Sequence, residues 1–379
     1  MNFEFVVPTL LGLEALCAKE LKMMGYETTV QDGRVMFCGD ETAVARANIN
    51  LRTGERVLIK TAQFRAESFN ELFEKTKSID WWRFIPSDGV FPVKGHCLKS
   101  KLASVPDCQS VIKKAISVSL GEKYNLERLP ESGALFRIQF SIRKDIVILM
   151  LDTSGAPLYK RGYRTEAGAA PLRETIAAAM VMLSFWKYET PLIDPFCGSG
   201  TILIEAAMFK RRIAPGICRS FAAENFPYIP ENVWENERRA AKAAVRNLPL
   251  KLYGYDINPE CISIASANAK HAGVGDCISF DLYPAEKFAP VEKFGTVICN
   301  PPYGERLGEK SQCEMLYRNI GKAFLKKDYW SFYIITSHED FESLFGRRAN
   351  KRRKVYNGMI KCNIYQYFGR RPEKGEAFT

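Results

Sequence analysis

Short apolar runs alternate with helix-patterned segments through the second half of this chain. Each run is apolar on both faces, and a helical pattern follows each of the first three. Runs of this kind, separated by helices, indicate a parallel sheet that helices cover on both sides. The four runs are PLIDPF (191–196), KLYGYDI (251–257), FGTVICN (294–300) and WSFYIITS (330–337). The pattern predicts an α/β domain over residues 157–379.

The end of the chain departs from this alternation. RKVYNGMIKCNIYQYF (353–368) consists of two β-rich stretches on either side of Asn357-Gly358. An Asn-Gly pair between two such stretches is a strong signal for an antiparallel hairpin with a type I′ turn. We therefore expect the parallel sheet to finish in an antiparallel hairpin.

Two smaller regions precede the α/β domain, as the length of 379 residues leads one to expect. Residues 1–62 alternate in the order strand, helix, strand, strand, helix, strand, which is the order of a ferredoxin-like unit. Residues 63–156 form a second small α/β region, with a helix start at Ser104 and strands on either side of its helix. No internal repeat or flexible linker separates the regions, so we expect them to pack together.

Composition narrows the classes of partner and compartment. The net charge of +11 and pI near 9.0 favour a polyanionic partner. The 11 cysteines are scattered without a CxxC pair and there are three histidines, so we expect neither a metal site nor a disulfide framework. No run of about 18 apolar residues indicates a membrane span, and the first 25 residues do not read as a signal peptide. A reducing cytoplasm is the expected location.

A glycine turn stands where the first strand of the α/β domain meets its helix. The sequence DPFCGSGT (194–201) lets the backbone approach a ligand closely, and the helix start offers free N–H groups. It lacks the lysine of the Walker pattern and the third glycine of GxGxxG, which disfavours a triphosphate. Asp256 ends the next strand, where a carboxylate can accept hydrogen bonds from ribose hydroxyls. The alternative role for Asp256 is to cap the helix that starts near Pro259.

The third strand ends in the motif NPPY. Asn300 follows directly on the strand, and the two prolines leave nearby carbonyls free to accept hydrogen bonds. If the Asn300 side-chain oxygen and the Pro301 carbonyl accept both N–H groups of a planar exocyclic amine, its nitrogen can turn its lone pair toward an electrophile. Tyr303 offers a ring on which a base can stack. The alternative is a simple proline turn, and Cys299, on the opposite strand face, is expected to be a buried structural thiol rather than a nucleophile.

These motifs resemble those of a known family. DPFCGSGT, GYDINP and NPPYGERL are similar to the motifs of S-adenosylmethionine-dependent, Rossmann-like class I methyltransferases that act on exocyclic amines. More narrowly, YKRGYRTEAGAAPLRETIAAAM (159–180), IAPGICRSF and NPPYGERLG resemble bacterial RNA guanine-N2 methyltransferases with an N-terminal THUMP domain, similar to the N-terminal half of the 23S rRNA guanine-N2 enzyme. The resemblance implies a ferredoxin-like domain (1–62), a THUMP RNA-binding domain (63–156) and a methyltransferase domain (157–379) with a seven-stranded sheet and antiparallel terminal hairpin.

The resemblance also implies roles for individual residues. The target amine would be held by Asn300, Pro301, Pro302 and Tyr303. S-adenosylmethionine would be bound by Arg164, Pro171, Leu172, Arg173, Asp194, Pro195, Cys197, Gly198, Gly200, Thr201, Asp256, Ile257, Asn258 and Asn300. Where many relatives place an Asp against the adenine amine, this chain has Pro284 or, three positions away, Asp281, so backbone is expected to make that contact. Glu305 is a candidate proton acceptor, with a solvated acid at a helix start as the alternative.

Two basic clusters are candidates for RNA contact. The first comprises Lys94, Lys99, Lys101, Lys113 and Lys114, and the second includes Arg347, Arg348, Arg352 and Arg353. The alternatives are a solvated face for the first cluster and a disordered charged loop for the second. With the resemblance, they predict methyl transfer to the N2 amine of a guanosine in structured RNA, rRNA before tRNA. The alternative functions are an adenine-N6 methyltransferase acting on DNA or RNA, and a non-catalytic RNA-binding or ribosome-assembly factor.

Overall fold

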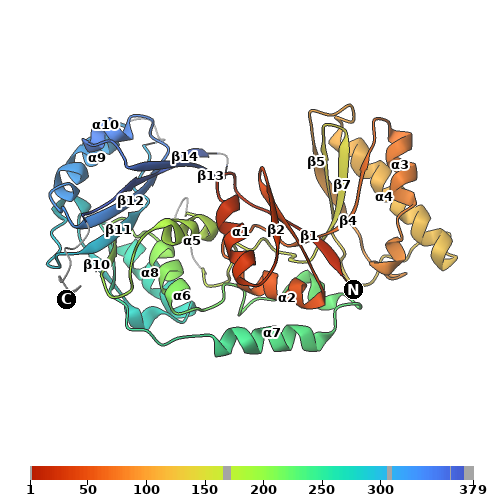
Figure 1. The fold of residues 1–379 in the computed structure, drawn as a ribbon, viewed down its shortest axis with the longest axis horizontal. Coiled ribbons are helices and arrows are strands. Elements are labelled where there is room, and N and C mark those ends of the chain that lie inside the picture. Colours follow the sequence, from red (N-terminus) through yellow and green to blue (C-terminus); the bar gives the residue numbers. More distant parts are fainter. Residues whose placement is uncertain (1, 165–171, 305–309, 359, 371–379) are drawn as a thin grey trace. The chain divides into compact units, whose positions relative to one another are not determined.

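The computed structural model describes residues 2–164, 172–304, 310–358 and 360–370, which fall into two compact units (Figure 1). Unit 1 contains Met1–Thr9, Ala18–Leu158 and Arg219–Ala240. Unit 2 contains Leu10–Cys17, Tyr159–Cys218 and Ala241–Thr379. Each unit therefore includes a short segment that the sequence order would assign to the other. No helix among the described residues is both long enough and apolar enough to cross a bilayer.

Unit 1 is built on one sheet, which has seven strands in the described residues, in the order β2-β3-β1-β4-β7-β6-β5. The strands are β1 (Phe3–Pro8), β2 (Thr28–Gln31), β3 (Arg34–Gly39), β4 (Leu58–Arg65), β5 (Val93–Leu98), β6 (Ile138–Arg143) and β7 (Ile146–Asp152). Its helices are α1 (Glu14–Met23), which begins in unit 2, α2 (Glu41–Asn50), α3 (Phe69–Lys77) and α4 (Val105–Tyr124). The first six elements confirm the predicted ferredoxin-like order. The antiparallel β4–β7 pair joins the strands of the ferredoxin-like unit to β7, β6 and β5 in one continuous sheet.

The helices of unit 1 begin at residues with capping side chains. Ser104 precedes α4, and its hydroxyl accepts a hydrogen bond from the Asp107 N–H at 3.4 Å, as the predicted helix start requires. Asp40 and Ser68 cap α2 and α3 in the same way. Left-handed Asn125, with φ 53°, ends α4. Local sequence signals therefore set these helix boundaries.

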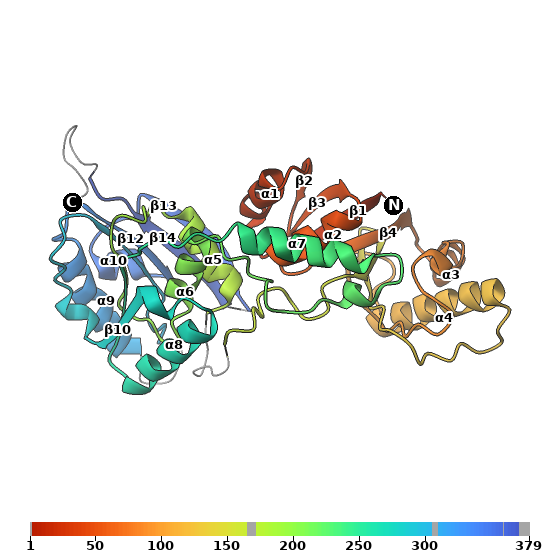
Figure 2. The same ribbon diagram turned by 90° about the horizontal axis from the view of Figure 1, so that it is seen from below.

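The segment 219–240 completes unit 1 from far along the chain. Its helix α7 (Glu231–Ala243) runs beside α2 (Figure 2), and Arg46 of α2 donates two hydrogen bonds to the Glu237 carboxylate at 3.0 and 2.8 Å. Phe226 stacks on Phe136 with ring centroids 4.7 Å apart. These contacts bind a segment that follows α6 of unit 2 into the core of unit 1.

Unit 2 confirms the predicted α/β architecture. In the part of the chain that is described, its sheet has seven strands in the order β10-β9-β8-β11-β12-β14-β13. The strands are β8 (Leu192–Asp194), β9 (Leu252–Asp256), β10 (Ile278–Leu282), β11 (Gly295–Cys299), β12 (Trp330–Thr336), β13 (Lys351–Asn357) and β14 (Ile360–Tyr367). The helices are α5 (Glu174–Leu183), α6 (Thr201–Lys210), α8 (Pro259–His271), α9 (Lys310–Phe324) and α10 (Phe341–Phe345). Strands β8 to β12 pair in parallel, and β14 is antiparallel to both β12 and β13.

The terminal hairpin forms, but its turn lies one residue later than the Asn-Gly pair predicts. Asn357 is the last residue of β13 and pairs with Ile360. Gly358, with φ 66°, is the residue that takes the left-handed conformation. Asn357 is therefore a strand residue and not the first central residue of a type I′ turn.

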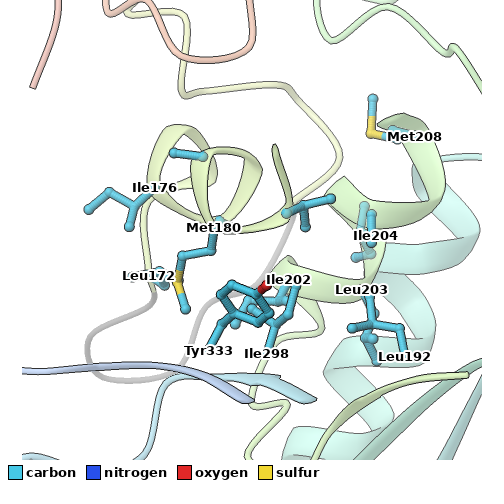
Figure 3. Close-up of a cluster of buried hydrophobic side chains, with 14 of the residues drawn as sticks. Leu172, Ile176, Met180, Leu192, Ile202, Leu203, Ile204, Met208, Ile298 and Tyr333 are labelled. Atoms are coloured by element: carbon cyan, nitrogen blue, oxygen red, sulfur yellow. The ribbon is translucent and has the colours of Figure 1, made fainter. Parts of the chain in front are cut away.

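Two apolar clusters cover the two faces of the unit 2 sheet. Figure 3 shows the first, in which Ile176 and Met180 of α5 and Ile202 and Leu203 of α6 pack around Ile298 of β11. Leu13 and Leu16, from the N-terminal segment of unit 2, belong to this cluster. The second cluster contains Val297 and Cys299 with residues of α9 and α10. Because neighbouring β11 residues enter opposite clusters, the strand is buried on both faces, as its apolar sequence predicts.

Candidate functional site

A cavity of about 560 Å³ opens at the carboxyl ends of β8, β9 and β11. The strand order reverses at β8, whose neighbours are β9 on one side and β11 on the other. Such a switch point is where open α/β sheets bind ligands. Its walls consist of Leu172, Asp194, Pro195, Phe196, Cys197, Gly198, Ser199, Thr201, Ile202, Asp256, Ile257, Cys261, Ile264, Pro284, Ala285, Glu286, Asn300, Pro302 and Leu316. The glycine turn, the β9 carboxylate and Asn300 thus share one cavity.

The glycine turn uses its two glycines for different purposes. Gly200 has φ 78°, and a Cβ there would lie 3.1 Å from Ala265 Cβ and 3.2 Å from Phe280 Cζ, so this glycine permits close packing of α6 on α8. Gly198 has φ 49°, and a Cβ there would have no described atom within 4 Å. Gly198 therefore leaves open space at the cavity wall, which suits close approach of a ligand to the backbone.

Asp256 is fixed by backbone donors from both sides. Its Oδ2 accepts from the Gly198 N–H and its Oδ1 from the Asn258 N–H, each at 3.0 Å. The helix cap that sequence reasoning offered as its alternative role belongs to Asn258, whose Oδ1 accepts from the Glu260 N–H at 2.9 Å. Asp256 thus ties the glycine turn to β9 and presents its carboxylate to the cavity. Asn258 is not among the described residues that line the cavity.

Asp194 is a buried carboxylate with one unused oxygen. Only 1% of the residue is exposed, and its Oδ1 accepts from the Phe196 N–H at 3.1 Å. Its Oδ2 has no hydrogen-bond partner among the described residues. Burial raises the pKa of the Asp194 carboxyl well above its usual value. The nearby Asp256 carboxylate raises this pKa further. A cationic ligand group in the cavity would satisfy this oxygen.

The cavity also has an apolar wall that sequence reasoning found only in part. Ile257 is 77% exposed, yet it lines the cavity. Cys261 and Ile264 of α8 continue the same wall. Cys261 and Ile264 are three residues apart on α8, which is the spacing of one helix face, so the sequence carried a signal that places these two residues together. A flat apolar ring is the kind of group that such a wall accommodates.

The NPPY segment is held by two tyrosine hydroxyls. Tyr303 donates to Asn300 Oδ1 at 2.6 Å, and Tyr317 of α9 donates to the Pro302 carbonyl at 2.6 Å. The Tyr317 oxygen also lies 3.0 Å from Thr336 Oγ1 of β12. Burial raises the pKa of Tyr317, so this hydroxyl keeps its proton. Sequence reasoning assigned Tyr303 a stacking face and did not find either hydroxyl contact.

Asn300 keeps acceptor capacity beside the cavity. A side-chain carbonyl has two lone pairs, so Asn300 Oδ1 can accept a second hydrogen bond while Tyr303 uses the first. Cys299, fully buried on the other strand face, has a pKa that burial raises well above its usual value. This confirms the predicted structural thiol and disfavours a cysteine nucleophile. Among the described residues, no group of three or more His, Cys, Asp or Glu could hold a metal.

Other predicted cofactor residues lie next to the cavity rather than on its wall. Arg164 donates to Thr201 Oγ1 at 2.7 Å and to the Leu172 carbonyl at 3.0 Å, so it links the cavity residue Leu172 to the start of α6. Arg173 precedes α5, and its guanidinium lies 5.0 Å from the Tyr159 ring centroid. Pro171 and Glu305 lie outside the described residues.

The lysines predicted to contact RNA in unit 1 are not equally available. Lys101 forms an ion pair with Glu67. Lys113 binds both Glu131 oxygens at 2.7 Å and lies 3.7 Å from the Phe91 ring centroid. Lys94, Lys99 and Lys114 are exposed. Two of the five predicted lysines are therefore engaged within unit 1.

The arginines near the C-terminus also separate into different environments. Arg347 and Arg348 are exposed ahead of β13. Arg352 and Arg353 lie within β13, so the disordered-loop alternative is wrong for them. Arg353 donates to the Gly12 carbonyl at 2.5 Å, whereas 58% of the Arg352 side chain is exposed. Strand alternation has thus placed these two neighbours on opposite faces.

Comparison with known families matches each region of the chain. Residues 161–366 match the RMKL-like methyltransferase domain, residues 4–58 the RlmL ferredoxin-like domain and residues 66–152 the THUMP domain. The "Putative RNA methyltransferase YpsC" of Bacillus subtilis (strain 168) is 45% identical over 98% of each chain. The "Ribosomal RNA large subunit methyltransferase K/L" of Psychromonas ingrahamii is 36% identical over 96% of this chain, which spans 50% of that protein.

Solved structures agree over almost the full length. SMU.472, solved in complex with SAH (S-adenosylhomocysteine), has a TM-score of 0.93 at 38% identity and covers 98% of this chain and 99% of its own. A Listeria monocytogenes protein described as a "predicted N6-adenine-specific DNA methylase" has a TM-score of 0.93 at 45% identity, covering 98% of this chain and 97% of its own. By sequence and by fold, the chain belongs to the RMKL-like methyltransferase family, with an RlmL ferredoxin-like domain and a THUMP domain before the methyltransferase domain.

Proposed function

We propose that this protein transfers a methyl group from S-adenosylmethionine to the exocyclic N2 amine of a guanosine in RNA, with 23S rRNA as the substrate. The observation that carries the proposal is the meeting of Asn300 and the glycine turn in one cavity. The cavity offers the unused buried carboxylate oxygen of Asp194 for a cationic group and the side-chain oxygen of Asn300 for an amine. The SAH complex of SMU.472, with its fold match over 98% of this chain, supports the choice of methyl donor.

Different cavity residues contact different parts of the cofactor. Asp194 Oδ2 accepts from the ammonium of the methionine part, next to the open backbone at Gly198. Asp256 accepts from the ribose hydroxyls. The wall formed by Ile257 packs against adenine, and the backbone near Pro284, which lines the cavity, faces the adenine edge. When bound, S-adenosylmethionine supplies a methyl group that is already activated on a sulfonium.

Asn300 and Pro301 act on the other reactant. Asn300 Oδ1 and the Pro301 carbonyl accept the two N–H groups of the target amine and so direct its lone pair toward the cavity. The Tyr303 hydroxyl fixes the Asn300 amide in the orientation that presents its oxygen. The protein thus works mainly by alignment, which can supply several kcal/mol of the barrier reduction. The proton released from the methylated amine passes to solvent.

RNA is favoured over DNA by the N-terminal half of the chain. THUMP domains are associated with RNA, and the two curated relatives are described as RNA methyltransferases. The exposed residues Lys94, Lys99 and Lys114 of unit 1 and Arg347, Arg348 and Arg352 of unit 2 are the proposed phosphate contacts. Adenine-N6 methylation is the second candidate, because NPPY can hold any planar exocyclic amine and because of the description given to the Listeria structure.

Nucleoside analysis distinguishes these functions. Purified protein is incubated with S-adenosylmethionine and rRNA from a strain that lacks the gene, and the RNA is digested and examined by mass spectrometry. We expect N2-methylguanosine in the digest of the treated rRNA. N6-methyladenosine would establish the second candidate instead. Cofactor binding without transfer to rRNA, tRNA or DNA would favour the assembly-factor alternative.

A further inference from the structure

A second hollow in unit 2 lies at the terminal hairpin. It has a volume of about 500 Å³ and is lined by Glu339, Arg352, Lys354, Lys361, Asn363 and Tyr365. We call it the hairpin groove. Arg352 and Lys354 come from β13, and the last three residues come from β14. Glu339 follows β12. Two neighbouring strands therefore supply nearly all of its surface.

Strand alternation explains why cations gather in this groove. Residues two apart on a strand point to the same face, so Arg352 and Lys354 share a face with their cross-strand partners Tyr365 and Asn363. The neighbouring residues Val355, Cys362 and Ile364 point the other way and belong to the first apolar cluster of unit 2. Burial of that apolar set fixes the register and leaves the cationic set on the opposite face.

The groove carries an excess of positive charge over a polar and aromatic floor. Arg352, Lys354 and Lys361 are exposed, and Glu339 is the single acid in the lining. Glu342 lies outside the lining, with its Oε2 3.9 Å from Arg352 Nη1. Tyr365 is buried at the floor, and Asn363 is half-buried beside it. Cations that repeat along a strand suit the repeating charge of a sugar-phosphate backbone.

A chain of contacts connects the hairpin groove to the NPPY segment. Asn363 pairs with Thr336, the last residue of β12. Thr336 Oγ1 lies 3.0 Å from the Tyr317 hydroxyl, which donates to the Pro302 carbonyl. The groove and the cofactor cavity thus lie at the same edge of the sheet, on opposite sides of NPPY. A strand in the groove would run toward the target-amine acceptors.

We propose that the hairpin groove binds the RNA backbone immediately beside the target nucleotide, with Arg352, Lys354 and Lys361 on its phosphates. This inference rests on the proposed function, because the flanking strand matters only if a base is presented at Asn300. A base must leave its stack to reach such a site, which costs a few kcal/mol. Phosphate contacts on β14 and β13, which β12 separates from the strand that ends at NPPY, offset that cost and hold the flanking strand while the base enters.

The test compares two double variants of equal charge change. Lys354→Gln with Lys361→Gln alters the groove, whereas Lys322→Gln with Lys326→Gln alters exposed lysines toward the opposite, amino-terminal edge of the sheet. A short fluorescein-labelled single-stranded RNA containing guanosine is titrated by fluorescence anisotropy at several salt concentrations. Each phosphate contact adds about 0.7 to the slope of log K against log[salt], so losing two lowers the slope by about 1.4. This corresponds to about 25-fold weaker binding at about 0.1 M salt.

We expect the groove variant to lose this affinity and the control to keep it, with both variants retaining the wild-type Tm and S-adenosylmethionine affinity. Wild-type affinity and salt slope in the groove variant would overturn the inference. An equal loss in both variants would also overturn it, because the binding would then follow total charge. If polyglutamate displaces the labelled RNA from the wild-type protein at a lower concentration than unlabelled RNA does, the groove binds an acidic protein instead of RNA.

Methylation assays separate this inference from the proposed function. If the wild-type protein methylates no RNA but the groove variant still loses oligonucleotide binding, the proposed function fails and the groove stands. If both proteins form N2-methylguanosine with the same KM for RNA, the groove inference fails and the function stands.

Discussion

Asp194→Asn should make unit 2 more stable and the protein a weaker cofactor binder. The buried Asp194 carboxylate has one oxygen without a hydrogen-bond partner among the described residues. Burial raises its pKa, which means that its charged form is disfavoured in the folded protein. An Asn can keep the bond from the Phe196 N–H without carrying the charge.

The gain comes from the charge on the unpaired oxygen, because the Asn Nδ2 that replaces this oxygen is polar but uncharged. An unsatisfied buried polar group costs about 1–3 kcal/mol, and more when it is charged. A gain of about 2 kcal/mol raises Tm by about 4–8 °C in a folding unit of about 150–250 residues. Loss of a charge-assisted hydrogen bond to the cofactor ammonium, at about 1.5–3 kcal/mol, weakens S-adenosylmethionine binding about 10- to 150-fold.

The pH dependence provides a second test of the same charge. Because the pKa of Asp194 is raised in the folded state, the folded protein binds more protons than the unfolded chain above the ordinary pKa of 3.8. The stability that this group contributes is therefore present at low pH and is lost as pH rises through the folded pKa. The stability difference between variant and wild type should be smallest near pH 4 and should grow toward neutral pH.

The measurements are thermal unfolding from pH 4 to pH 8, with and without S-adenosylmethionine, and isothermal titration of the cofactor. Asp152→Asn is the contrasting control, because that buried carboxylate accepts from Arg56, from Gln139 at 3.1 Å and from the Ser154 N–H at 2.9 Å. Asp152→Asn should destabilise unit 1 and leave cofactor affinity unchanged. An Asp194→Asn protein that is less stable than wild type at neutral pH, or that binds cofactor normally, would refute the reasoning.

Three further substitutions test the site. Asn300→Ala should lower turnover by about 10²- to 10³-fold in single-turnover assays and spare cofactor affinity, by analogy with loss of one transition-state hydrogen bond; unchanged turnover would remove Asn300 from the mechanism. Tyr317→Phe removes the hydroxyl that holds the Pro302 carbonyl, so kcat should fall about 10-fold with an unchanged KM for S-adenosylmethionine; an effect on Tm alone would make Tyr317 purely structural. Gly200→Ala places a Cβ 3.1 Å from Ala265 at φ 78° and should cost at least about 1–2 kcal/mol, seen as a lower Tm; wild-type stability would show that α6 can shift.

The main features of the cavity could be predicted because they depend on short-range pattern. An apolar strand fixes where its last residue lies, and parallel strands bring their ends to one edge, so Asp194, Asp256 and Asn300 could be placed together without a structure. The capping residue Ser104 and the ferredoxin-like strand order were predictable for the same reason. The roles proposed for these site residues stay predictions.

Contacts between segments that are far apart in the sequence could not be predicted, because no short-range pattern marks them. Tyr317 follows Pro302 by 15 positions and reads in the sequence as one more apolar residue of a helix. The hairpin turn shows a conflict between local and distant preferences. Asn357-Gly358 favours a turn centred on itself, but pairing of β14 with β12 and burial of Val355 and Ile364 set the register, and the turn moved by one residue.

The exchange of segments between the two units sets an order of events during synthesis. Unit 1 lacks α7 until residue 240 has been made, although the rest of unit 1 ends at Leu158. At about 5–20 residues per second, that gap lasts about 4–16 s. During this interval Phe136 and Arg46 have no partner from the later segment, and Leu13 and Leu16, made first, wait for the cluster that buries them. The nascent chain therefore emerges with two apolar surfaces that only its later residues can cover, and it should depend on chaperone protection longer than a protein whose domains fold in sequence.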